Sequence, residues 1–308
     1  TTEIYTLSLH DALPILYWLA AAEWADKNGA DIINSSLGYT AKRYFNWQMD
    51  GKTTFVTRAA NIAARKGMLV VNAAGNEGTD KWHFIGAPAD ADSVLSVGGI
   101  DPATGYHTSF SSFGPTADKR MKPNVSAYGH VIAAAPAGLT STQGTSFASP
   151  LVAGFAACAW QSNRMLTNMQ LFHEIEKSGS LYPYFDYAHG YGVPQAGYFV
   201  NAKPSTPEPS FKVVESGDSL TIVIEKPLAA ANKVNPGFGK SFSEHVEPGP
   251  GTNPEYLYYN IMDAGGVLRS YYVVAVTQPN ALTLNKSDYQ PGDTLNVHYA
   301  GYSISLKL

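Results

Sequence analysis

Two stretches in the first quarter of the chain combine a helical pattern of apolar residues with a continuous apolar run. The helical patterns span residues 16–24 and 55–63, and the apolar runs that follow them span residues 32–37 and 68–71. A glycine after each helical pattern indicates where the helix ends, at Gly29 and at Gly67. A helix followed by a buried strand, occurring twice, predicts a parallel sheet with helices on both faces.

Shorter elements continue this pattern up to about residue 200. We expect a strand near residues 94–97, a Ser/Gly loop at 109–115, a strand around 131–135, a helix that opens at Ser146 and an amphipathic helix within 167–180. Together with the two helix and strand pairs, these elements predict an α/β fold.

The pattern changes at a Pro-rich stretch, residues 203–210. Beyond it the apolar residues occur in β-rich runs joined by Gly, Asp and Asn turns, which predict a small antiparallel β-sandwich. We therefore divide the chain into a leader at 1–15, an α/β domain at 16–203, a linker at 204–210 and an all-β domain at 211–308.

Composition excludes several classes of protein. The chain has 308 residues, of which 44% are hydrophobic and 15% are charged, and this is typical of a globular protein. A formal net charge of -4 gives no basic surface for nucleic acid. The single cysteine, Cys158, excludes an internal disulfide, and we expect it to be a small buried residue of a helix. No apolar stretch approaches the roughly 20 residues that a membrane span needs.

Two motifs carry candidate chemistry. In QGTSFASPLVAG, residues 143–154, a Gly-Thr turn places Ser146 at a helix N-terminus, where backbone amides and the helix dipole favour negative charge. In NAAGNEG, residues 72–78, a strand ends in a turn that projects Asn76, whose amide can donate to an oxyanion. Taken alone, Asn76 is better explained as a residue that stabilises its turn. The two motifs together favour a nucleophile with an oxyanion hole.

These motifs resemble those of the subtilisin-like serine peptidases, the subtilase family, over residues 18–200. GTSFASPLVAG resembles the nucleophile motif and implies Ser146 as the catalytic serine, and AAGNEG resembles the oxyanion motif and implies Asn76. The resemblance implies a subtilisin-like parallel sheet in part, and the all-β sandwich that follows it is predicted from the residue pattern alone. It also implies a substrate groove lined by Ser36, Leu37, Gly38, Ala73, Ala74 and Gly75, with Gly86 at the floor of a pocket for a large apolar side chain.

The family's catalytic Asp and His motifs do not occur upstream of Ser146, and we assign neither residue in this chain. His10 and Asp11 lie in the wrong order, lack the flanking glycines and belong to a stretch that resembles no part of the family. We therefore expect residues 1–15 to be a non-native leader on an N-terminally truncated peptidase domain. Such a chain is expected to hydrolyse peptides slowly or not at all.

Two functions from different classes remain open. One is a serine endopeptidase that acts on peptide or protein substrates and is secreted or held in the cell envelope as the full-length protein. The other is a non-catalytic module that binds peptides in the same groove. We expect no cofactor and assign no metal ligand, although calcium sites are common among subtilases. GDSL at residues 217–220 spells a motif of another hydrolase family, but the alternating residues after it predict a hairpin turn.

Overall fold

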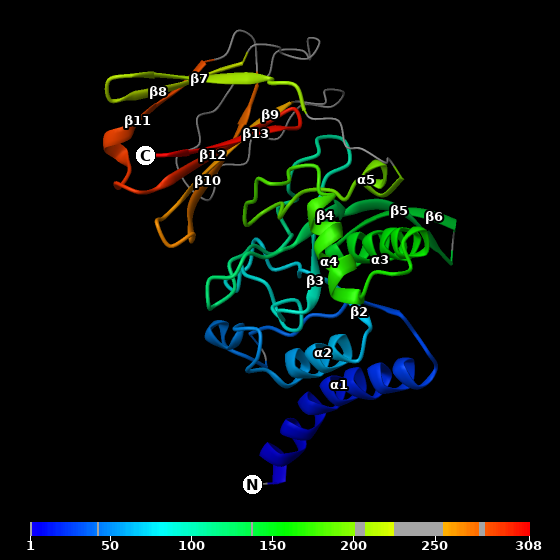
Figure 1. Ribbon diagram of the computed structural model, residues 1–308. Coiled ribbons are helices and arrows are strands. Elements are labelled where there is room, and N and C mark those ends of the chain that lie inside the picture. Colours follow the sequence, from blue (N-terminus) through cyan, green and yellow to red (C-terminus); the bar gives the residue numbers. More distant parts are fainter. Residues whose placement is uncertain (1, 42, 137, 201–206, 225–254, 277–280) are drawn as a thin grey trace. The chain divides into compact units, whose positions relative to one another are not determined.

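The computed structural model describes residues 2–41, 43–136, 138–200, 207–224, 255–276 and 281–308 (Figure 1). Within the first helix, side chains are described from Pro14 onward. The chain forms two compact units. The first comprises most of the described residues up to 200, and the second comprises those from 207 onward with the segments Ala103–Gly105 and Leu181–Asp186.

A four-stranded parallel sheet forms the centre of the first unit. Its strands are β1 (Ile32–Ser35), β2 (Leu69–Ala73), β3 (Val94–Ile100) and β4 (Val125–Tyr128), in the spatial order β1-β2-β3-β4. All residues of β2 and β3 are buried, as expected for strands covered on both faces. The predicted parallel sheet is confirmed; β4 was not predicted, because its four residues show no distinctive pattern.

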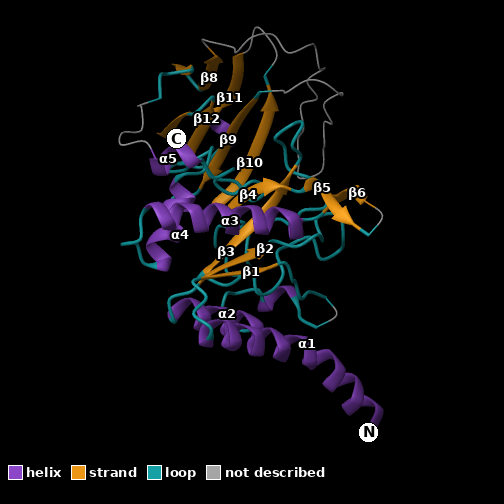
Figure 2. Ribbon diagram, turned by 90° about the vertical axis from the view of Figure 1, so that its right-hand side faces the viewer, coloured by secondary structure: helices purple, strands orange, loops and turns teal. Residues whose placement is uncertain are grey.

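Helices cover both faces of this sheet, as Figures 1 and 2 show. The helices are α1 (Thr2–Lys27), α2 (Phe55–Arg65), α3 (Thr145–Ser162), α4 (Asn168–Lys177) and the short α5 (Ala196–Val200). Val70 packs with residues of α1 and α2, whereas its neighbours Leu69 and Val71 pack with residues of α3 and α4. Since successive side chains of a strand point to opposite faces, this contact pattern places the two helix pairs on opposite sides.

The start of the chain makes contacts within the first unit. The backbone oxygen of Pro14 accepts a hydrogen bond from the hydroxyl of Tyr39 at 3.1 Å, and Ile15 is buried. The indole nitrogen of Trp18 donates to Ser35 Oγ at 3.0 Å. Whether residues 1–15 are native stays a prediction.

The strand predicted at 131–135 is confirmed as β5 (His130–Ala135), and it pairs antiparallel with β6 (Gly138–Gln143), outside the parallel sheet. A pattern of small residues predicts a strand without specifying its partner. One expectation for the first unit needs correction. Cys158 is exposed on α3 and not buried, because that side of the helix faces away from the sheet.

Helix α2 begins at a threonine cap. Thr54 Oγ1 accepts a hydrogen bond from Thr57 N at 3.2 Å, and Thr54 is buried. We expect Thr54→Ala to lower the free energy of unfolding of the first unit by about 1 kcal/mol, because a first-turn amide loses its partner. Urea unfolding followed by tryptophan fluorescence measures this, since all five tryptophans lie in the first unit. The exposed neighbour Thr53→Ala is the control, and an equal loss there would contradict the explanation.

The second unit is an antiparallel β-sandwich, as predicted. One sheet has the order β10-β9-β12-β13 and the other β11-β8-β7. The strands are β7 (Phe211–Ser216), β8 (Ser219–Ile224), β9 (Tyr256–Met262), β10 (Leu268–Ala275), β11 (Ala281–Asn285), β12 (Thr294–Tyr299) and β13 (Tyr302–Lys307). Buried residues of both sheets, among them Ile222 and Leu295, share one core.

The GDSL sequence forms a turn in this sandwich. Ser216 pairs with Ser219 across β7 and β8, so Gly217 and Asp218 form a two-residue hairpin loop, and Gly217 has a φ of +57°. The prediction of a hairpin turn is confirmed. The predicted boundary at residues 203 and 204 lies outside the described residues.

Candidate active site

Ser146 is the second residue of α3, directly after a sharp turn. The turn residue Gly144 has a φ of +146°, a conformation that favours glycine, and its N–H donates to Gly129 O at 2.8 Å. The N–H groups of the first helical turn have no partner within the helix, and that of Ser146 is one of them. The sequence therefore places a hydroxyl and a free amide of the same residue at the positive end of a helix dipole.

Asn76 reaches this helix start from the loop after β2. Its Oδ1 accepts a hydrogen bond from Thr145 N at 2.9 Å and lies 3.0 Å from Thr145 Oγ1. Both contacts use the amide oxygen, so Nδ2 is directed away from Thr145. Asn76 Nδ2 makes no hydrogen bond within the part of the chain that the structure describes.

The free donor of Asn76 lies close to that of Ser146. A Cβ atom built on Gly144 would lie 3.6 Å from Asn76 Nδ2 and 3.7 Å from Ser146 N. Both donors therefore border the space beside Gly144 that a side chain would fill. Two convergent N–H donors next to a serine hydroxyl can stabilise the oxygen of a tetrahedral adduct. The structure thus brings together the two residues that the sequence singled out.

The predicted groove residues lie at the carboxyl ends of two neighbouring strands. Strands β1 and β2 run parallel with Ser35 opposite Asn72, so residues 36–38, which follow β1, lie at the same edge as residues 73–75, which begin with the last residue of β2. Ser36 Oγ donates to Ser146 O at 2.9 Å, and Ser146 Oγ donates to Ser36 O at 3.4 Å. The groove residues after β1 are therefore hydrogen-bonded directly to Ser146, the candidate nucleophile.

At Gly86 the neighbouring segment lies so close that a side chain would collide with it. A Cβ atom there would lie 2.8 Å from Thr40 Cγ2 and 3.2 Å from Tyr39 O. Tyr39 and Ala87 exchange backbone hydrogen bonds at 2.9 and 3.2 Å, which holds the two segments together. The glycine thus permits a close approach of two chain segments, and its role in binding a large apolar side chain stays a prediction.

No described histidine side chain contacts Ser146. The hydroxyl of Ser146 has a single hydrogen bond within the described residues, the one to Ser36 O. The histidines of the first unit bond elsewhere, with His83 at Gly78 O, His107 N donating to His189 Nε2, His130 at Gln143 and His173 at Glu176. The side chains of His10 and Asp11, and all of His245, lie outside the described residues.

Sequence reasoning missed two residues that shape the site. Thr145 orients the amide of Asn76, and Asn72 donates from Nδ2 to Leu37 O at 3.1 Å, which fixes the groove segment after β1. Thr145 lies beside the predicted nucleophile, so a search of the motif's own neighbours would have found it. Asn72 has no such signal, because a buried polar residue within an apolar strand indicates only that some partner exists.

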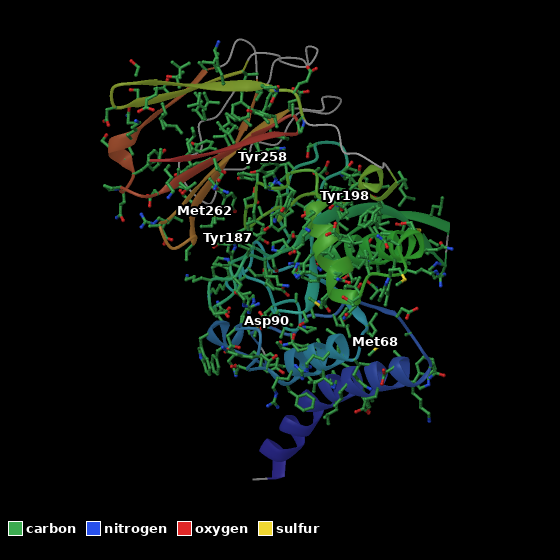
Figure 3. All side chains as sticks on the ribbon, in the orientation of Figure 1. Met68, Asp90, Tyr187, Tyr198, Tyr258 and Met262 are labelled. Carbon is green, nitrogen blue, oxygen red and sulfur yellow. The ribbon has the colours of Figure 1, made fainter. Side chains whose placement is uncertain are left out.

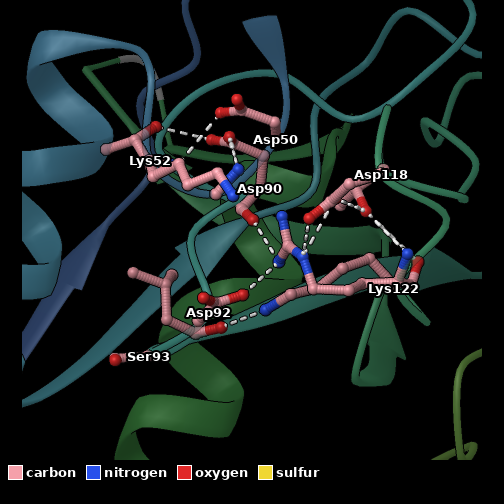
Figure 4. Close-up of polar contacts among 12 residues, drawn as sticks. Asp50, Lys52, Asp90, Asp92, Ser93, Asp118 and Lys122 are labelled. Atoms are coloured by element: carbon pink, nitrogen blue, oxygen red, sulfur yellow. Dashed lines mark hydrogen bonds and ion pairs between the residues drawn. The ribbon is translucent and has the colours of Figure 1, made fainter. Parts of the chain in front are cut away.

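Two ionisable groups with shifted pKa values, Asp90 on the loop before β3 and Lys122 on the loop before β4, lie in a buried cluster (Figures 3 and 4). Burial raises the pKa of Asp90 to about 6, although Thr57 Oγ1 and Gly51 N donate to its carboxylate. Burial also lowers the pKa of Lys122 to about 7, and its ammonium donates to Val94 O and to Asn124 Oδ1. Arg120 donates to Asp90 O at 2.7 Å and pairs with Asp92 and Asp118. These contacts give the cluster a structural role.

Within the described residues, no group of three or more His, Cys, Asp or Glu side chains is arranged to hold a metal ion. The described residues therefore offer no site to which calcium can be assigned.

Comparison with known proteins assigns the family. The profile of the Subtilase family matches residues 12–192, more than half of the chain. The chain belongs to the subtilase family, and the α/β unit with a partial subtilisin-like sheet is the part that carries the match.

Curated relatives cover the same part of the chain. Subtilisin DY of Bacillus licheniformis is 35% identical over 164 residues, which is 53% of this chain and 54% of that protein. Alkaline elastase YaB of Bacillus sp. (strain YaB) is 34% identical over 158 residues, 51% of this chain and 37% of that protein. The chain spans about half the length of the first of these relatives and less of the second.

Solved structures give similar coverage. Sphericase is 28% identical with a TM-score of 0.48, over 59% of this chain and 62% of its own. MycP1 from Mycobacterium smegmatis is 24% identical with a TM-score of 0.48, over 66% of this chain and 59% of its own.

Proposed function

We propose that this chain carries the nucleophile and oxyanion hole of a serine endopeptidase. The observation that carries the proposal is the contact between the two motifs, in which Thr145 N donates to Asn76 Oδ1 at 2.9 Å. This hydrogen bond holds the amide oxygen away from the reacting group and leaves Nδ2 to donate. Membership of the subtilase family supports the same roles for Ser146 and Asn76.

The proposed reaction is acyl transfer. Ser146 Oγ attacks the carbonyl carbon of a peptide bond, and the carbonyl electron pair moves onto its oxygen. Asn76 Nδ2 and Ser146 N donate hydrogen bonds to this oxyanion, and the α3 dipole favours its charge. Collapse of the adduct breaks the C–N bond, the proton taken from Ser146 Oγ passes to the leaving nitrogen, and the amine departs to leave an ester on Ser146, which water then hydrolyses.

The proton of Ser146 needs a base, and the resemblance implies a histidine oriented by an aspartate. Neither is assigned in this chain, and no described carboxylate or imidazole bonds to Ser146 Oγ. We therefore propose that residues 1–308 hydrolyse peptides slowly or not at all unless such a base is supplied. In subtilisin itself, the oxyanion hole and substrate binding alone retain a rate of roughly 10³ to 10⁴ over water when triad residues are removed.

The proposed substrate is an extended peptide or protein segment between residues 36–38 and 73–75, with a large apolar side chain directed toward Gly86. No helix within the described residues is long and apolar enough to cross a membrane. We propose a secreted or cell-envelope location for the full-length protein, which agrees with its family.

A second function is a module that binds peptides without cutting them. The absence of a base among the described neighbours of Ser146 favours it. The intact Asn76 and Ser146 pair favours the peptidase, because peptide binding needs neither group.

Covalent labelling tests the proposal. A fluorophosphonate probe is expected to phosphonylate Ser146 slowly, as located by peptide mass spectrometry, because the donors near Gly144 stabilise the adduct although no described base takes the serine proton. Ser146→Ala should lose the label completely, whereas Ser141→Ala, which removes an exposed serine of β6, should keep it. Peptide binding without labelling, even after a segment that carries the Asp and His motifs is added upstream, would contradict the peptidase and support the binding module. Adding an upstream segment with the Asp and His motifs should speed the labelling.

A further inference from the structure

The loop that projects Asn76 belongs to no helix or strand, yet its backbone is held on both sides of Asn76 by one residue. Ser112 N donates to Gly75 O at 3.0 Å, and Glu77 N donates to Ser112 Oγ at 3.1 Å. The same hydroxyl donates to Glu77 Oε2 at 3.0 Å. Ser112 therefore bonds to the residue before Asn76 and to the residue after it.

The packing around these bonds leaves little room for the loop to move. Ser112 is fully buried. A Cβ atom on Gly75 would lie 2.6 Å from Ser112 Oγ and 2.4 Å from Glu77 Oε2, and Gly75 has a φ of +118°. Gly78 N donates to Phe110 O at 2.9 Å and fixes the next turn of the loop. The register of the loop is thus determined by the segment that contains Ser112.

We propose that Ser112 is a positioning residue for the oxyanion hole. It fixes the backbone of Asn76, while Thr145 fixes its amide oxygen, so Nδ2 is aimed before any substrate binds. Preorganised donors stabilise an oxyanion most when they need no rearrangement. This inference rests on the proposed function of Asn76 and adds the residue on which its geometry depends.

The adjacent serine provides a matched control. Ser111 is also fully buried, and its Oγ accepts a hydrogen bond from Gly99 N at 3.0 Å, which connects it to β3. Each of the substitutions Ser111→Ala and Ser112→Ala therefore removes one fully buried hydroxyl group. Only the second substitution removes contacts to the loop of Asn76.

The experiment compares these two variants of the full chain by two measurements. Ser112→Ala is expected to slow fluorophosphonate labelling of Ser146 by about 10-fold, because loss of a buried hydrogen bond loosens the donor. Amide hydrogen exchange at Glu77 should become at least several-fold faster, since that amide loses its acceptor. Ser111→Ala should leave the labelling rate and the exchange at Glu77 unchanged.

The two measurements separate the inference from the proposed function. The inference is overturned if Ser112→Ala is labelled at the wild-type rate and its hydrogen exchange at Glu77 is unchanged. It is also overturned if Ser111→Ala slows the labelling as much as Ser112→Ala does. If the wild-type chain takes no label even when a segment that carries the Asp and His motifs is added upstream, the proposed function fails. In that case, unchanged hydrogen exchange at Glu77 in Ser112→Ala would also show that Ser112 does not hold the loop of Asn76. Faster exchange would show that Ser112 holds the loop for structural reasons only, and would reject its role in the oxyanion hole.

Discussion

Asn76→Asp is expected to slow the reaction of Ser146 with a fluorophosphonate by about 100-fold or more. The substitution keeps Oδ1 as an acceptor for Thr145 but replaces the Nδ2 donor with a second oxygen. A single oxyanion donor contributes on the order of 10² to 10³ in rate, and a negative charge in its place also repels the developing anion. The measurement is the second-order labelling rate, with circular dichroism to confirm that the fold is retained.

The aspartate variant separates two explanations of Asn76. If Asn76 only held its turn against Thr145, Asn76→Asp would retain that contact and label at close to the wild-type rate. Asn76→Ala removes both the acceptor and the donor, so it should be slowed and also destabilised. A labelling rate for Asn76→Asp within about 3-fold of wild type would contradict the donor role, given the magnitude expected for an oxyanion donor.

Lys122→Met is expected to change how the stability of the first unit depends on pH. Burial lowers the pKa of Lys122 to about 7 from 10.5, so between these values the unfolded chain binds a proton that the folded chain does not. Binding of this proton stabilises the unfolded state, and it weakens as the pH rises through this window. The wild type therefore gains stability relative to the variant as the pH rises. Below about pH 7 both states are protonated and the difference is constant.

The size of this effect follows from the shift in pKa. Each unit corresponds to 1.36 kcal/mol, so the stability of wild type relative to Lys122→Met should rise by about 2 to 4 kcal/mol between pH 7 and 10. Asp90 has its raised pKa at about 6, and its own contribution changes at lower pH. Urea unfolding at several pH values, followed by tryptophan fluorescence, measures the first unit alone. Parallel curves for the two proteins would show that Lys122 is charged when folded.

The regular elements of the first unit were largely predictable because each carries its own local pattern. Strands β2 and β3 are buried on both faces and are mostly apolar, with Asn72 and Ser96 as polar exceptions, and α2 combines a helical apolar face with a threonine cap. Strand β4 was missed, because four residues contain too little periodicity. The pairing of β5 with β6 was missed because partner choice depends on contacts outside the strand.

The candidate site shows the same division. The sequence by itself determined which groups are present, a serine hydroxyl at a helix start and an asparagine amide after a buried strand, because both follow from local turn and helix signals. Only the tertiary structure decided that Thr145 orients this amide, although the two residues are 69 positions apart in the sequence. It also decided that Ser112 holds the loop of Asn76 through Glu77, which is 35 positions away. Hydrogen bonds between segments so far apart leave no periodic trace in the sequence, because they depend on how the sheet brings its loops to one edge.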